Sequence, residues 1–174
     1  MIISSHLKSA LIVLLSLSLS ACGFHLRSAD ELPPQLHKLC LKTPNPYNGF
    51  TVKLRNLLRS LGLSVEPSCK DSPYRLTVYS INLTRDNPNI TDANQAVSFT
   101  YTLNVEFDLK NSKDQVILSK RVLTANRVVI LNSQQIYTSY NTGTIQNQLE
   151  QIVANQVFEQ LITLESKKQF ERFP

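Results

Sequence analysis

The feature that most constrains the fold of this sequence is an unbroken alternation of apolar and polar residues between positions 97 and 109. The apolar members are Val97, Phe99, Tyr101, Leu103, Val105, Phe107 and Leu109, with one polar residue between each pair. In a β-strand, successive side chains point to opposite faces of the sheet, so a period of two separates the two classes. The segment is therefore predicted to be one long strand with a buried face and a wet face.

The segments on either side of this strand are also predicted to be extended. Residues 74–84 and 115–131 are rich in β-branched and aromatic residues, as is typical of strands. A polar loop at 86–94 and a short turn at 110–114 connect the three strands. Two short apolar runs, at 36–41 and 63–66, predict two further short strands.

Two helices are predicted from apolar residues three and four positions apart. The first spans 51–61 and is followed by Gly62, which suits the left-handed residue after a helix end. The second spans 144–165. Phe158 and Ile162 lie to one side of its apolar face, either as the edge of the core or as a small exposed patch for a partner. The apolar face itself comprises Ile145, Leu149, Ile152, Val153, Val157, Leu161 and Leu164.

The order of these elements, β-α-β-β-β-β-α, predicts the fold class. We expect an α+β two-layer sandwich in which two helices pack on one face of a mostly antiparallel sheet. Residues 36–165 would form this single domain, and 166–174 a tail. A chain of this length can bury a sizeable core in one domain.

The N-terminal residues have the pattern of a bacterial lipoprotein leader. Lys8 precedes an apolar run at 11–19, which is too short to cross a bilayer, since a membrane-spanning helix needs about 20 residues. Leu19-Ser20-Ala21-Cys22 then matches a lipobox, with small residues before a cysteine. We expect a signal peptide at 1–21, cleavage between Ala21 and Cys22, a lipid attached to Cys22, and a tether at 22–35. The alternative is an ordinary secretory peptide with a cysteine at this place by chance.

Two further cysteines, Cys40 and Cys69, remain in the mature chain. In an oxidising compartment they would pair in a disulfide, and otherwise they would be small buried apolar side chains. The sequence leaves both alternatives open. We expect no metal and no cofactor, because His25 and His37 are the only histidines after the leader and both stand near the tether.

The charge balance and the missing motifs narrow the function. The leader carries one of the 18 basic residues, so a mild basic excess over 13 acidic residues remains, without a block of like charges. Nucleic acid is therefore not expected as a partner, whereas phosphorylated lipid is compatible with the excess. No nucleophile, phosphate-loop or zinc spacing occurs, and we expect the protein not to be an enzyme. The alternative is an envelope lipoprotein that acts as an enzyme or a lipid carrier on its own, without a protein partner in the membrane.

Residues 132–143 are polar but uncharged. This composition is typical of a flexible loop, or of a hydrogen-bonding surface for a partner, in which Tyr137 and Tyr140 would be the anchors.

Four stretches together resemble the LPS-assembly lipoprotein family, LptE (also called RlpB). The stretches are Cys22-Gly-Phe-His-Leu-Arg27, the predicted helix Thr51 to Gly62, the strand segment Tyr101 to Phe107, and the Gln-rich final helix. The resemblance implies an outer-membrane lipoprotein that forms a plug in the β-barrel LptD. It also implies that the protein assists assembly of the barrel and the delivery of lipopolysaccharide to the outer leaflet.

The resemblance further implies that basic residues contact lipopolysaccharide from the loop before the long strand and from the loop before the last helix. The first position falls near Thr91, which is not basic, and the second in a stretch without a cation. Arg85 and Arg127 are the nearest basic residues and are the candidate lipopolysaccharide contacts. The alternative is that both are ordinary charges at strand ends.

Overall fold

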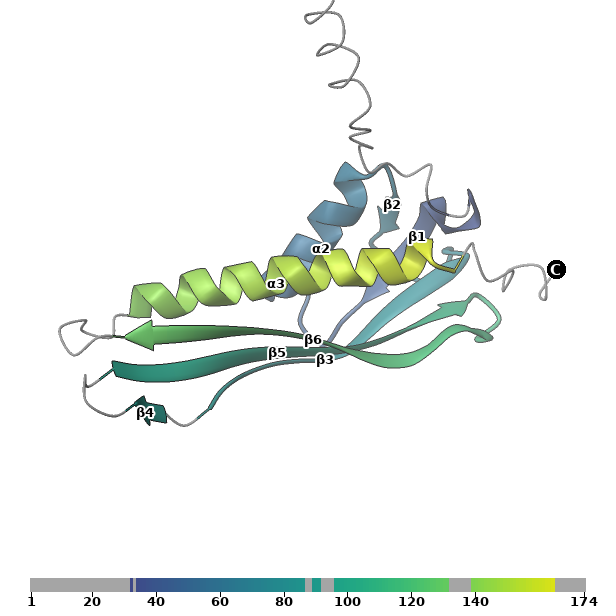
Figure 1. Cartoon of the computed structure of the whole chain (residues 1–174). Helices are drawn as coiled ribbons and strands as arrows, with labels where there is room; N and C mark the ends of the chain where they lie inside the picture. The colour runs from purple at the N-terminus through teal and green to yellow at the C-terminus, as the bar shows by residue number, and fades with distance from the viewer. Residues whose placement is uncertain (1–31, 33, 87–88, 92–95, 132–138, 165–174) are drawn as a thin grey trace, which may run out of the picture.

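The computed structural model describes residues 32, 34–86, 89–91, 96–131 and 139–164 (Figure 1). After the 3-10 helix η2 (Pro34–His37), the elements are β1 (Lys38–Lys42), α2 (Gly49–Ser60), β2 (Ser64–Glu66), β3 (Tyr74–Arg85), β4 (Asn89–Thr91), β5 (Ala96–Asn111), β6 (Val116–Leu131) and α3 (Ser139–Ile162). Both long helices cover the same face of the sheet (Figure 1). The predicted α+β class with two helices on one face is confirmed.

The sheet is mixed, with its antiparallel part built around β5. β1 runs parallel to β2 and to β3, while β3 and β6 pair antiparallel with the two edges of β5. β4 pairs with the same β5 residues as the end of β6 does, so it must lie on the other edge, where it continues β3. The predicted loop at 86–94 is therefore partly wrong, because 89–91 add three residues to the sheet.

The alternation that predicted the long strand also predicted its buried face. Tyr101, Leu103, Val105, Phe107 and Leu109 are at most 2% exposed and form the centre of the core. The strand extends slightly beyond the prediction at both ends, since the pairing on both sides supplies partners for its backbone groups.

α2 begins where the side chain of Asn48 accepts a hydrogen bond from the backbone N–H of Phe50, at 2.9 Å. Leu54 and Leu58 of the predicted stripe are fully buried. Gly62 follows the helix with a φ of 91°, the left-handed conformation predicted for it.

α3 differs from its prediction at both ends and on one face. It begins at Ser139, so residues 139–143 are helical rather than part of a loop. Phe158 is 1% exposed and belongs to the core, whereas Ile152 is 43% exposed and was wrongly placed on the apolar face. The buried arc is turned toward Glu150 and Phe158, because α3 packs against α2 as well as against the sheet. Within the described residues, no helix is long and apolar enough to cross a membrane.

The two helices are joined by an ion pair whose carboxylate is buried and whose lysine is half-buried. The carboxylate of Glu150, in a residue 2% exposed, lies 2.5 Å from Lys53 Nζ and accepts a hydrogen bond from Gln146 Nε2 at 2.9 Å. A Cβ on Gly49 would lie 2.8 Å from Glu150 Oε2, so the glycine makes room for the carboxylate. These contacts fix the height at which α2 meets α3.

A disulfide joins Cys40 of β1 to Cys69 in the segment between β2 and β3. Cys40 alternates with Leu39 and Leu41, which pack in the core, so it lies on the face of the sheet that carries no helix. The disulfide therefore holds the segment around Cys69 against the helix-free face of β1.

We predict that Lys53→Met lowers the free energy of unfolding by about 1–3 kcal/mol, since it leaves the Glu150 carboxylate buried without its charge partner. The control is Lys38→Met, which removes the exposed partner of Glu66 at 3.8 Å and should cost at most about 1 kcal/mol. Urea unfolding curves measure both. Equal, small losses in the two variants would contradict the structural role of the buried pair.

We also predict that replacing Cys40 and Cys69 together by Ala costs about 2–4 kcal/mol, since the link spans 29 residues of the unfolded chain. The urea midpoint of the unreduced wild type should exceed that of the double variant. Reductant should lower the wild-type midpoint and leave that of the double variant unchanged. A wild-type midpoint insensitive to reductant would be the contrary result.

Candidate functional site

The structure brings the two candidate arginines onto one rung of the sheet. Tyr101 of β5 pairs with Arg85 of β3 on one side and with Arg127 of β6 on the other. With strands about 4.8 Å apart, the Cα atoms of the two arginines are separated by about 10 Å. We call Arg85, Tyr101 and Arg127 the distal rung.

All three side chains leave the sheet on the face that the helices cover. Tyr101 is 2% exposed and belongs to the core. Arg85 comes two residues after Leu83 in β3, and Arg127 comes two residues after Ala125 in β6. Residues two apart in a strand share a face, and Leu83 and Ala125 both face the core. The two arginines are nevertheless exposed, so they flank a buried aromatic residue at the margin of the core.

A second aromatic residue extends the rung. The guanidinium carbon of Arg85 lies 5.0 Å from the centroid of the Phe99 ring. A cation over an aromatic face is attracted by the negative charge of the ring face, and the contact limits where the guanidinium can move. The guanidinium of Arg85 therefore packs over the ring of Phe99 at the margin of the core.

A groove of about 220 Å³ adjoins the rung. Its lining residues come from β3, β5 and α3: Leu83, Thr84, Arg85, Tyr101 and Thr142. The lining combines an apolar floor, hydroxyl groups and a guanidinium, and arginine binds phosphate oxygens through two parallel N–H donors. Such an arrangement suits an anionic head group attached to an apolar body.

The remaining predicted site residues lie elsewhere or outside the described residues. Ala21, Cys22 and Tyr137 are outside them, as is the side chain of Tyr140. The backbone of Tyr140 belongs to the first turn of α3, so it does not stand in a loop as predicted. The disulfide Cys40–Cys69 is on the helix-free face of the sheet, opposite to the face on which the side chains of the distal rung lie.

Sequence reasoning missed Phe99 and Tyr101 as parts of the site, because alternation marked them only as core. Counting back from the turn at 110–114 would give an approximate pairing of β5 with β6. The irregularities between Phe107 and Leu109 and between Leu109 and Lys110 shift that register, so the partner of Tyr101 could not be counted from the turn.

A separate polar network occupies the helix-free face. The Tyr79 hydroxyl donates to Asp108 Oδ2 at 2.7 Å, and this bond to a carboxylate raises the pKa of Tyr79. The bond to Glu106 raises the pKa of Lys120. Both shifts move away from neutrality, so neither group is suited to exchange protons at neutral pH. Among the described residues, no cluster of histidine, cysteine and carboxylate side chains could hold a metal ion.

The sequence is similar in part to proteins of known name. No family model matches the chain. It is 38% identical over 56 residues to the LPS-assembly lipoprotein LptE of Yersinia enterocolitica, a match that covers 31% of this chain and 27% of the relative. It is 30% identical over 89 residues to the LPS-assembly lipoprotein LptE of Pectobacterium atrosepticum, covering 50% and 48%. The chain thus spans less than half the length of the curated relatives it matches.

Solved structures share the fold over most of the chain. Lipoprotein B from Nitrosomonas europaea superposes with a TM-score of 0.66 at 15% identity, covering 83% of this chain and 93% of that one. Rare lipoprotein B from Shewanella oneidensis gives 0.63 at 15% identity, covering 74% and 96%. Over part of its length the chain is thus similar in sequence to proteins named LPS-assembly lipoprotein LptE, and it shares its fold with solved structures of lipoproteins.

Proposed function

We propose that this chain is an outer-membrane lipoprotein, acylated on Cys22, that forms a plug in the LptD β-barrel and assists its assembly. In this role it would help to deliver lipopolysaccharide to the outer leaflet. It would act by binding and positioning, without a catalytic step of its own. The relation to proteins named LPS-assembly lipoprotein supports the general role in lipopolysaccharide assembly.

The observation that carries a direct contact with lipopolysaccharide is the distal rung. The resemblance to the LptE family implies contacts from the loop before the long strand and from the loop before the last helix. Arg85 ends β3, shortly before β5, and Arg127 lies four residues before the end of β6, toward α3. Pairing through Tyr101 brings these two basic residues to either side of one aromatic floor, which supports them as substitutes for basic residues in the loops.

The charge and the surroundings of the rung favour a phosphorylated lipid. An arginine guanidinium binds phosphate oxygens through a fork of donors, and the Cα atoms of the two arginines lie about 10 Å apart, so one head group could engage both side chains. Arg127 forms no ion pair with a carboxylate of the described residues, which leaves its charge available for a ligand. The groove beside the distal rung and two further grooves of the described residues all have charged side chains in their lining. A lipid carrier would instead need an apolar cavity.

The contact with the barrel is proposed for the uncharged stretch at 132–143. The inner wall of a membrane β-barrel is polar, so a plug needs hydrogen-bonding groups and a few aromatic anchors rather than an apolar surface. Tyr137 and Tyr140 are the aromatic residues of this stretch. Because α3 begins at Ser139, the second of them is carried by a helix rather than by a free loop.

We predict that Arg85→Gln with Arg127→Gln weakens binding of purified lipopolysaccharide about tenfold or more, since each charge-assisted contact contributes about 1–3 kcal/mol. Titration of the detergent-solubilised mature lipoprotein with fluorescent lipopolysaccharide measures the change. The control, Lys38→Gln with Lys113→Gln, removes the same charge elsewhere and should leave the affinity within about twofold. Equal losses of affinity in both double variants would mean that the overall charge, and not these two arginines, determines the binding.

The barrel partner is tested by co-purification from detergent-solubilised outer membrane, which should recover LptD in stoichiometric amount. We predict that Tyr137→Ala with Tyr140→Ala weakens this complex by a few kcal/mol, as expected for aromatic hot spots. Arg55→Glu with Arg59→Glu, on the outer side of α2, should leave the complex intact. Recovery of the wild-type chain without a barrel would count against the proposed function. The reverse pattern of the two variants would move the contact to α2.

A further inference from the structure

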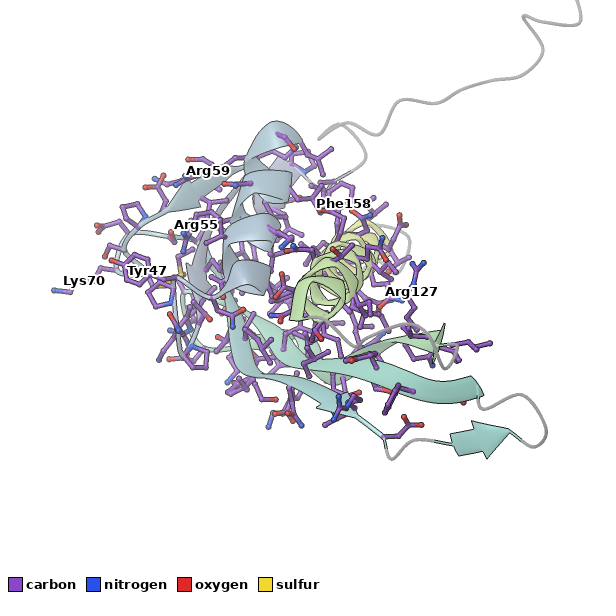
Figure 2. All side chains as sticks on the ribbon, turned by 90° about the vertical axis from the view of Figure 1, so that its left-hand side faces the viewer. Tyr47, Arg55, Arg59, Lys70, Arg127 and Phe158 are labelled. Atoms are coloured by element: carbon purple, nitrogen blue, oxygen red, sulfur yellow. A yellow bond between two sulfur atoms is a disulfide. The ribbon has the colours of Figure 1, made fainter. Side chains whose placement is uncertain are left out.

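Basic and aromatic side chains collect on the side of the molecule away from Arg127. Tyr47, Arg55, Arg59 and Lys70 project from this side (Figure 2). They come from three segments: the connection 43–48 between β1 and α2, the outer side of α2, and the segment after the disulfide cysteine Cys69. We call these four residues the basic edge.

Tyr47 is the aromatic residue of the basic edge, and it is 89% exposed. Its connection is nevertheless held in place from both sides. The backbone N–H of Tyr47 donates to Asn45 Oδ1 at 2.9 Å, and Arg55 Nη2 donates to the Pro46 carbonyl at 3.4 Å. An aromatic ring is thus presented to the surroundings on a constrained turn, where it has no role in the core.

Arg55 and Arg59 form the rim of a groove of about 320 Å³ beside this connection. The other lining residues are Leu41, Pro46, Val65, Glu66 and Pro67. Arg59 Nη2 donates to the Val65 carbonyl at 3.3 Å. A guanidinium carries five N–H groups, so each arginine keeps further donors after its one bond to a backbone carbonyl.

A second groove, of about 490 Å³, lies on the other side of the same connection. Its lining includes Lys42, Pro44, Arg75, Lys110 and Asp114. Arg75 pairs with Asp114, and Lys110 lies 3.4 Å from the buried Asp108. Two grooves with basic residues in their lining therefore adjoin the connection that carries the exposed Tyr47, and Pro44 lines one of them and Pro46 the other.

We propose that the basic edge docks on an anionic phospholipid surface, with Tyr47 at the level of the head groups and the cations on lipid phosphates. The occupant is a layer rather than a single molecule, because the three cations of the basic edge stand on two separate segments and only Arg55 and Arg59 share a groove. Tyrosine suits this boundary, since its ring is apolar and its hydroxyl is polar. Lysine and arginine side chains near an anionic membrane are attracted to the phosphates of its lipids.

The inference rests on the acylation of Cys22 in the proposed function. Leu32, the first described residue, follows Cys22 by ten positions, and a fully extended chain of ten residues spans about 36 Å at most. The anchor therefore keeps the domain close to the bilayer without choosing which side faces it. The charge and the exposed tyrosine of the basic edge make that choice, and they leave Arg127 of the distal rung on the side away from the membrane surface (Figure 2).

The chain contains no tryptophan, so a single tryptophan can report where one side chain lies. The mature acylated chain is prepared with Tyr47→Trp, and separately with Val128→Trp on β6, at the opposite margin of the sheet. Val128 is 59% exposed and is a matched surface position. Each protein is reconstituted into vesicles of phosphatidylethanolamine and phosphatidylglycerol with brominated acyl chains. We expect quenching of tryptophan at position 47 to exceed that at position 128 several-fold.

Charge variants in the Tyr47→Trp background test the role of the cations. Arg55→Gln with Arg59→Gln should reduce the quenching to the level seen at position 128, and raised salt should act in the same direction. Lys120→Gln with Arg121→Gln removes the same charge from β6 and should leave the quenching unchanged. Equal quenching at positions 47 and 128, or equal effects of the two double variants, would overturn the proposal that the basic edge docks on the lipid surface.

Flotation of the vesicles separates this inference from the proposed function. If the protein floats but quenching is equal at both positions, docking through the basic edge is refuted and the lipid anchor on Cys22 is not. Protein that does not float refutes both the anchor and the docking. Co-purification with LptD tests the barrel partner without any reference to the vesicles.

Discussion

The structure depends on the burial of one face of β5. Its apolar residues form the centre of the core, and both of its edges are paired, by β3 and β4 on one side and by β6 on the other. A strand with one apolar face needs a cover on that face, and α2 and α3 supply it. The helix-free face remains polar along β5, and the residues there, such as Glu106 and Asp108, form ion pairs with lysines instead of packing in a core.

The helices are held to one another as well as to the sheet. The Lys53–Glu150 pair lies between them, and the missing side chain at Gly49 gives the carboxylate its space. A buried carboxylate is costly without a partner, so this pair favours one arrangement of the two helices over others that apolar contacts alone would permit. The disulfide has a comparable effect on the helix-free face, where it ties the segment before β3 to β1.

These constraints produce two surfaces of different chemistry on opposite sides of the domain. The distal rung combines two arginines with the buried Tyr101, beside the half-buried Phe99, and suits a phosphorylated lipid held by specific contacts. The basic edge spreads its cations around an exposed tyrosine and suits a lipid layer. In the proposed role, one side of the lipoprotein would rest on the membrane while the other meets lipopolysaccharide. The same scaffold would thus separate anchoring from cargo contact.

The sequence alone determined the long strand, the flanking strands, both helices and the glycine that ends the first helix, because each follows from a local period or a local backbone preference. It also supplied the resemblance to the LptE family. It did not determine the side of α3 that is buried, since Ile152 and Phe158 exchange roles once α2 packs against that helix. Nor could it give β4, or the pairing of Arg85 and Arg127 with Tyr101. Those depend on strand register, which bulges near Phe107 and Val78 shift and which only the folded sheet decides.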